Sequence, residues 1–175
     1  MSKLFRTTLW ILSGIGLIAF LVQTLSTFLI SPLMGLLSLL IAAVLVALVI
    51  FLLQRSPMWA RPARLWALLA FLWGGGVAVA LALISSGPVM QLAIGTGWVD
   101  AMMSWSGAYP EEISKATGVI FVLMSFRQLN RPWHGWLVGA VVGLGFEACE
   151  NILYGAMGAT MHPDSDVQGL FEMWG

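Results

Sequence analysis

Long apolar runs, each of the length that a helix needs to cross a membrane, dominate this sequence. A hydrocarbon core about 30 Å thick is crossed by roughly 20 apolar residues. Only 9% of the residues are charged, whereas soluble domains carry about 25%, which excludes a water-soluble globular fold. We predict a single membrane domain over residues 1–175, an all-α polytopic bundle of about five transmembrane helices. The predicted helices cover residues 9–30, 33–53, 65–84, 108–126 and 133–158.

The positions of the basic residues predict an orientation for this bundle. With the N-terminus in the cytoplasm, seven of the eight Lys and Arg residues fall on the inner side, and the eighth, Lys115, lies within the fourth predicted helix. This distribution follows the positive-inside rule. Residues 85–107 then stay outside as an interfacial segment, because a crossing there would move the last two arginines outside. The lipid bilayer is an expected partner, whereas the lack of a basic patch argues against nucleic acid.

Half of the acidic residues lie inside the last two predicted helices, at Glu111, Glu112, Glu147 and Glu150. A charge at the bilayer centre costs about 2.5–3.5 kcal/mol, so such residues usually have a function. At ~1.5 Å per residue, Glu111 lies about 22 Å from the inner end of its helix, and Glu147 and Glu150 lie roughly 21 and 26 Å from theirs. Because the two helices are antiparallel neighbours, we expect the carboxylates to meet at one level in the outer part of the membrane.

A structural alternative exists for part of this cluster. Pro110 suits the start of a helix, and acids in the first turn suit its dipole. Capping would explain Glu111 and Glu112, but it would not explain Glu150, which lies in mid-helix.

The neighbouring residues have supporting roles in this interpretation. For Glu147, a structural ion pair with Lys115 and a catalytic role fit the sequence equally well. We expect Asn151 to be a hydrogen-bond partner of the cluster. The single cysteine, Cys149, is expected to be a small core residue, and Tyr154 a packing residue with a polar tip.

Clustered carboxylates suit a divalent metal that activates water. The metal lowers the pKa of its bound water, a free carboxylate takes the proton, and the resulting hydroxide attacks a peptide carbonyl. Zinc usually also takes a histidine. However, His134 lies more than ~19 Å along its helix from Glu147, and we expect His162 to be a loop residue beyond the last helix.

Two segments resemble the PrsW family of intramembrane metalloproteases. Residues 108–115, AYPEEISK, are similar to the family element that carries paired glutamates followed by a lysine. Residues 143–154, GLGFEACENILY, are similar to its G-x-G-F-x-x-x-E-N-x-x-Y element. The resemblance implies that Glu111 and Glu112 are catalytic, that Glu112 and Glu150 bind a divalent metal, most simply zinc, and that the remaining polar neighbours support them. These supporting residues are Lys115, Glu147 and Asn151.

Proteases of this family make the first cut in membrane-bound anti-sigma factors on the outer side. The resemblance therefore implies a multi-pass metal-dependent protease of the bacterial cytoplasmic membrane that acts on membrane-protein substrates. The family has a further element, a histidine in a later span, which this sequence does not reach before Gly175. We accordingly expect a shortened family member.

Two other functions remain open. The first is a non-catalytic binding or scaffold protein of the same fold, which the missing histidine favours. The second is a cation or proton conductor that uses the four carboxylates as its pathway. Against a conductor, the inner half of the last helix carries Gly135, Gly139 and Gly143, a spacing that predicts close packing with another helix instead.

Overall fold

The computed structural model describes residues 3–62, 64–162 and 167–170, and all regular structure in these ranges is helical. This confirms the all-α prediction. The elements in chain order are α1 (Lys3–Ile30), α2 (Pro32–Arg55), α3 (Arg64–Leu72), the π-helical segment η1 (Trp73–Ala78), α4 (Val79–Gly95), η2 (Val99–Ala101), α5 (Met102–Ser106), α6 (Ala108–Ser125) and α7 (His134–Met161).

Four helical stretches are long and apolar enough to cross a membrane, which confirms a polytopic bundle. They are Lys3–Ile30, Pro32–Arg55, Leu65–Gly95 and His134–Gly158. Helix α6 is not among them, because Glu111, Glu112 and Lys115 all fall within its 18 residues. A fifth crossing by α6 stays a prediction.

The third predicted helix ends later than expected. The sequence predicted that this helix ends at residue 84 and that residues 85–107 form an outer segment. In the structure the helix continues to Gly95. The hydroxyls of Ser85 and Ser86 donate to helix carbonyls four residues earlier, at 2.6 and 2.7 Å, so these polar residues do not end the helix. Pro88 is also accommodated inside α4. Only the short elements η2 and α5 turn the chain from α4 back into α6.

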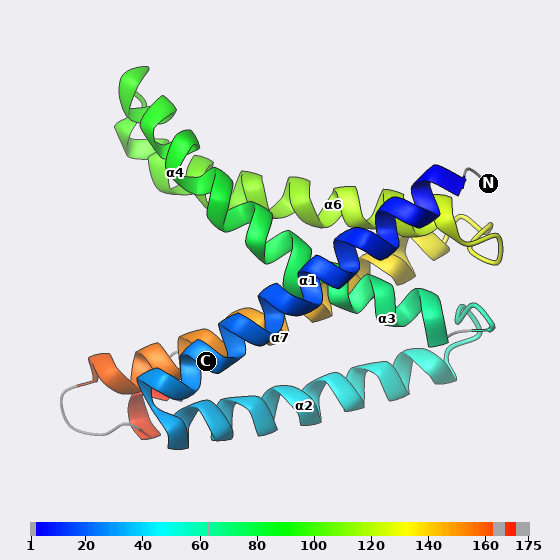
Figure 1. Ribbon diagram of the computed structural model, residues 1–175, viewed down its shortest axis with the longest axis horizontal. Helices are drawn as coiled ribbons and strands as arrows, with labels where there is room; N and C mark the ends of the chain where they lie inside the picture. Colours follow the sequence, from blue (N-terminus) through cyan, green and yellow to red (C-terminus); the bar gives the residue numbers. More distant parts are fainter. Residues whose placement is uncertain (1–2, 63, 163–166, 171–175) are drawn as a thin grey trace.

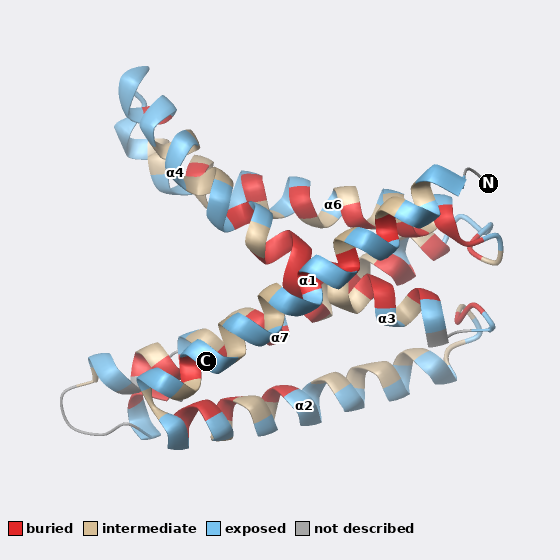
Figure 2. Cartoon of the chain, viewed as in Figure 1, coloured by how far each residue is buried: buried red, intermediate tan, exposed pale blue. Residues whose placement is uncertain are grey.

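At the centre of the bundle, α1, η1 and α7 cross one another, and glycines lie where their backbones come closest. All six residues of η1 are buried, and the buried positions concentrate around this crossing in Figure 2. A Cβ on Gly76 would overlap the backbone of Gly16 on α1, and one on Gly74 would overlap the carbonyl of Val142 on α7. The close approach therefore uses the glycine run of η1.

The inner half of α7 is buried at Leu137, Val138, Val141 and Val142, but the prediction that its glycine row is the closely packed face is wrong. Nothing lies within 4 Å of a Cβ built on Gly143, and the nearest atom to one on Gly139 is a methyl of Val119 at 3.9 Å. The tight position on α7 is instead Gly145, where a Cβ would overlap the carbonyl of Phe71. Regular spacing of glycines did not reveal which face of α7 meets its neighbour.

The two ends of the bundle differ (Figure 1). The N-terminus, the α2–α3 connection and the α6–α7 connection lie together at one end, whereas at the other end α4 and α6 diverge from α1, α2 and α7. We call the first the basic end, because it holds most of the cations, and the second, which the positive-inside rule predicts to face outside, the outer end. The described cations of the basic end are Lys3, Arg6, Arg55, Arg61, Arg127 and Arg131.

Candidate functional site at the outer end

The start of α6 places its two glutamates in different surroundings. Glu111 is half-buried in the first turn, where its charge suits the helix dipole. Glu112 forms an ion pair with Lys115 at 2.6 Å, and its side chain is 71% exposed. Lys115 is 18% exposed, and its Nζ lies 4.3 Å from the centre of the Phe146 ring on α7. The lysine thus links Glu112 to the α6–α7 interface.

The other two glutamates, Glu147 and Glu150, lie on helix α7 and have different surroundings. Glu150 is half-buried, and its Oε1 accepts a hydrogen bond from the hydroxyl of Tyr154 at 3.3 Å. Glu147 is exposed and lines, together with Asn151, a cavity of about 70 Å³ that faces α2. The ion pair considered for Glu147 is not formed, since Lys115 pairs with Glu112 among the described residues.

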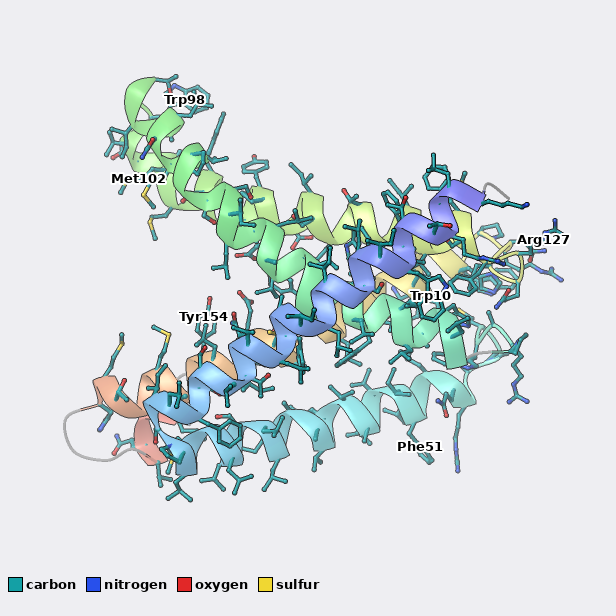
Figure 3. All side chains as sticks on the ribbon, viewed as in Figure 1. Trp10, Phe51, Trp98, Met102, Arg127 and Tyr154 are labelled. Carbon is teal, nitrogen blue, oxygen red and sulfur yellow. The ribbon has the colours of Figure 1, made fainter. Side chains whose placement is uncertain are left out.

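Charged groups on both α6 and α7 lie within electrostatic range of Glu150. Glu150 on α7 lies close enough to Glu111 on α6 for their charges to interact, and Lys115 and Glu147 also act on Glu150. The charge of Glu111 reaches Tyr154 as well. In Figure 3, Tyr154 projects from α7 towards the side on which α4 and α6 lie. Glu111 and Glu150 are thus a pair of the predicted carboxylates on different helices within electrostatic range of each other, and their meeting in one pocket stays a prediction.

Trp73 fixes the position of α6, and sequence reasoning missed it. Its indole N–H donates to the carbonyl of Ser114 at 3.0 Å, and its ring stacks on Phe121 at 5.2 Å. The ring also lies against Gly118, where a Cβ would overlap it. The signal that could have found Trp73 is the glycine run that follows it directly in the sequence.

The two histidines do not lie beside the carboxylates along α7. His134 is buried at the basic end, where its Nδ1 accepts a hydrogen bond from the backbone N–H of Arg131 at 3.1 Å. His162 directly follows α7, about 18 Å along the helix from Glu150 at ~1.5 Å per residue. Cys149 is buried in the core, as expected for a packing residue.

The described residues do not form a complete metal site on their own. No group of three or more His, Cys, Asp or Glu within residues 3–62, 64–162 and 167–170 is placed to bind a metal ion. A catalytic zinc ion uses three protein ligands. Glu112 is paired with Lys115, and Glu150 accepts a hydrogen bond from Tyr154. Metal binding by these two glutamates thus stays a prediction.

A mostly apolar groove of about 480 Å³ runs beside the start of α6. Val89 and Leu92 of α4 form one wall, and Pro110 and Ile113 of α6 form the other. Trp105 lies at its end, where it contacts Trp98 edge to face at 4.9 Å. The groove suits apolar side chains, and its described lining contains no Asp or Glu.

Comparison with known proteins bears directly on this region. A family model described as PrsW family intramembrane metalloprotease matches residues 62–175, roughly two thirds of the chain. No curated protein and no solved structure matches the chain. The matched residues include the glycine crossing of η1 and α7, the start of α6 and all four carboxylates.

Proposed function

Because this chain belongs to the PrsW family of intramembrane metalloproteases, we propose that it is an endopeptidase that cuts membrane-protein substrates, such as anti-sigma factors, near the outer face of the bacterial cytoplasmic membrane. The proposal is supported most by the family match over residues 62–175, together with the placement of Glu111 and Glu150 on the neighbouring helices α6 and α7 within electrostatic range of each other. Placing half-buried carboxylates in a membrane costs free energy. Such residues are therefore usually retained because they have a function.

The proposed topology puts the basic end in the cytoplasm and treats residues 1–175 as one membrane domain. It is supported by the shared position of the N-terminus and the two arginine-containing connections. In this arrangement α6 is the fifth crossing. Its charged start then lies towards the outer face, next to the α4–α6 groove, which would hold apolar residues of the substrate.

The chain's own groups can handle the proton of the attacking water. Lys115 neutralises Glu112 and Glu147 faces α2, so Glu111 and Glu150 are the carboxylates that remain on the side shared by α6 and α7. A general base must lie within hydrogen-bond reach of the water that it deprotonates. We propose Glu111 for this role, with Tyr154 orienting Glu150 through its hydroxyl and Asn151 and Glu147 completing the polar surroundings.

We further propose that zinc is the metal, with Glu112 and Glu150 among its ligands. When bound, zinc supplies a more acidic water and polarises a carbonyl. The proposal requires Glu112 to exchange its ion pair with Lys115 for the metal, and it requires a further ligand beyond those described. Metal analysis of purified protein should find zinc in the wild type and less of it in Glu112→Gln.

A non-catalytic relative of the same fold is the second candidate function. The observation that favours it is that the described residues lack a group of three metal ligands. A conductor is disfavoured, because Trp66, Trp73 and Phe146 are almost completely buried in the core between the two ends.

The deciding experiment is proteolysis in liposomes with a single-span substrate derived from an anti-sigma factor. Glu111→Gln and Glu150→Gln should each slow cleavage by about 100-fold or more, in line with the loss of general acid–base catalysis. Asp100→Asn is the matched control, because it removes an exposed carboxylate of η2 outside the site. Cleavage by the double glutamine variant at the wild-type rate would contradict the role proposed for the two carboxylates, whereas a wild type that cleaves no faster than protein-free liposomes would support the non-catalytic alternative.

A further inference from the structure

A second large cavity lies at the basic end, away from the carboxylates. Its volume is about 700 Å³, and it is formed between the start of α1, the start of α3 and the end of α6. Three cations line it: Lys3 and Arg6 from α1, and Arg127 from the α6–α7 connection. Its described lining contains no Asp or Glu. Such a concentration of positive charge without a counter-ion suits an anion.

A buried hydroxyl in the wall of this cavity has no partner. The side chain of Ser125, at the end of α6, is 2% exposed, and its Oγ makes no hydrogen bond. Leaving a buried hydroxyl unpaired costs about 1–3 kcal/mol, so a ligand that accepts from it would recover that cost. Thr7 and Gln128 add further polar groups to the lining.

The rest of the cavity is apolar and continues along the outside of α1. Trp10 and Ile11 form part of the lining and are 47% and 59% exposed. Ile15, Ile18 and Val22 extend the same exposed apolar face along α1, each more than half exposed. Figure 3 shows Trp10 and Arg127 near the basic end, with Trp10 farther into the bundle. A ligand that fits both parts has an anionic head and apolar chains.

We propose that this cavity binds an anionic phospholipid, with the phosphate among Lys3, Arg6 and Arg127 and the acyl chains along α1. Basic pockets between transmembrane helices on the cytoplasmic side suit anionic headgroups. The positive end of the α1 dipole lies on the same side and adds to the attraction. A free phosphate would use the cations but would leave the apolar face unoccupied, so the structure favours a lipid.

Native mass spectrometry tests this with protein incubated in an equal mixture of phosphatidylglycerol and phosphatidylcholine. The wild type should retain phosphatidylglycerol preferentially. Arg6→Gln with Arg127→Gln should lower that preference by about five-fold for each charge removed. Arg55→Gln with Arg61→Gln is the matched control, because it removes the same charge from the same end outside the cavity, and it should leave the preference unchanged. An equal loss in the control would overturn the proposal.

Two further measurements distinguish a bound phospholipid from a free phosphate ion and from an empty cavity. Ser125→Ala should weaken phosphatidylglycerol retention several-fold without changing phosphatidylcholine retention, whereas a merely structural serine would alter neither. Inorganic phosphate at millimolar concentration should fail to displace the bound lipid. Displacement by phosphate, or unchanged retention in Ser125→Ala, would show that the cavity is not a phospholipid site.

Discussion

The crossing of α1, η1 and α7 and the carboxylate-bearing start of α6 differ in how closely their helices pack. At the crossing, every residue of η1 is buried and backbones touch where glycines meet. At the start of α6, Glu112, Tyr109 and Ile113 are each more than half exposed. One region has no room for a methyl group, and the other leaves long side chains largely exposed.

This difference indicates that the two regions have different roles in the bundle. Protein interiors packed at this density tolerate little displacement, so the crossing fixes the order and register of the central helices. Trp73 transmits that register to α6 through its hydrogen bond to Ser114. The outer end has fewer packing contacts, and functional segments that move are usually drawn from such regions. Substrate access and chemistry can therefore vary there without disturbing the crossing.

The largest expected effect breaks the crossing itself. Gly74→Ala places a methyl group on the carbonyl of Val142, so η1 and α7 must separate. Overpacking typically costs 1–3 kcal/mol, and here the obstacle is backbone, so we expect a loss of about 3 kcal/mol or more. Thermal unfolding of detergent-purified protein measures it.

Gly143→Ala is the matched control for Gly74→Ala. Open space surrounds Gly143 within the same bundle, and alanine is preferred over glycine inside a helix by roughly 0.5–1 kcal/mol. The same chemical change should therefore stabilise the protein at one position and destabilise it at the other. Equal tolerance of both substitutions would contradict the description of the crossing as closely packed.

A smaller effect tests whether Trp73 couples the crossing to the carboxylates. Trp73 and Trp66 both donate at 3.0 Å to a backbone carbonyl, of Ser114 and Ala60 respectively. Trp73→Phe and Trp66→Phe should each destabilise the protein by about 1–3 kcal/mol. Only Trp73→Phe should slow proteolysis at least ten-fold, because a displacement of the reacting groups by about 1 Å can cost 100-fold.

Because Trp73→Phe and Trp66→Phe are expected to lose similar stability, their cleavage rates can be compared directly. Equal rates for the two variants would mean that α6 keeps its position without Trp73. The outer end would then be independent of the crossing.

Much of the fold was predictable because membrane crossing leaves a strong signal. Long apolar runs located the helices, and Ser31-Pro32 marked the break between α1 and α2, where Pro32 starts the second helix. The end of α4 was misjudged because serine hydroxyls bond within a helix as readily as they end one. Local sequence does not distinguish the two outcomes.

The site was predictable in part, for a physical reason. Counting residues along two antiparallel helices gives the depth of a side chain, and Glu111 and Glu150 lie within electrostatic range of each other. Counting does not give the rotation of each helix. Helix rotation depends on packing, here on Gly145 and Gly118, and it turns Glu147 towards α2.

The smallest expected effect is the coupling between Glu112 and Lys115, which measures how far the start of α6 is exposed to water. Glu112 and Lys115 are three residues apart on α6, with Glu112 71% exposed and Lys115 18% exposed, and helical pairs in contact with water contribute about 0.2–0.5 kcal/mol. A double-mutant cycle with Glu112→Gln and Lys115→Met isolates this coupling, because the contact of Lys115 with Phe146 is lost equally in both branches. Thermal unfolding at low and high salt should give a coupling of about 0.5 kcal/mol that falls as salt rises.

A second cycle, Lys115→Met with Asp100→Asn, is the control and should show no coupling that falls as salt rises, as expected for groups that share no contact. If the Glu112–Lys115 coupling instead exceeded about 2 kcal/mol and ignored salt, the pair would be shielded from water. The outer end would then be as closed as the glycine crossing. In that case breaking the Glu112–Lys115 ion pair would cost too much free energy for Glu112 to bind a metal. Both the metal-binding role proposed for Glu112 and the contrast between the two regions would then be contradicted.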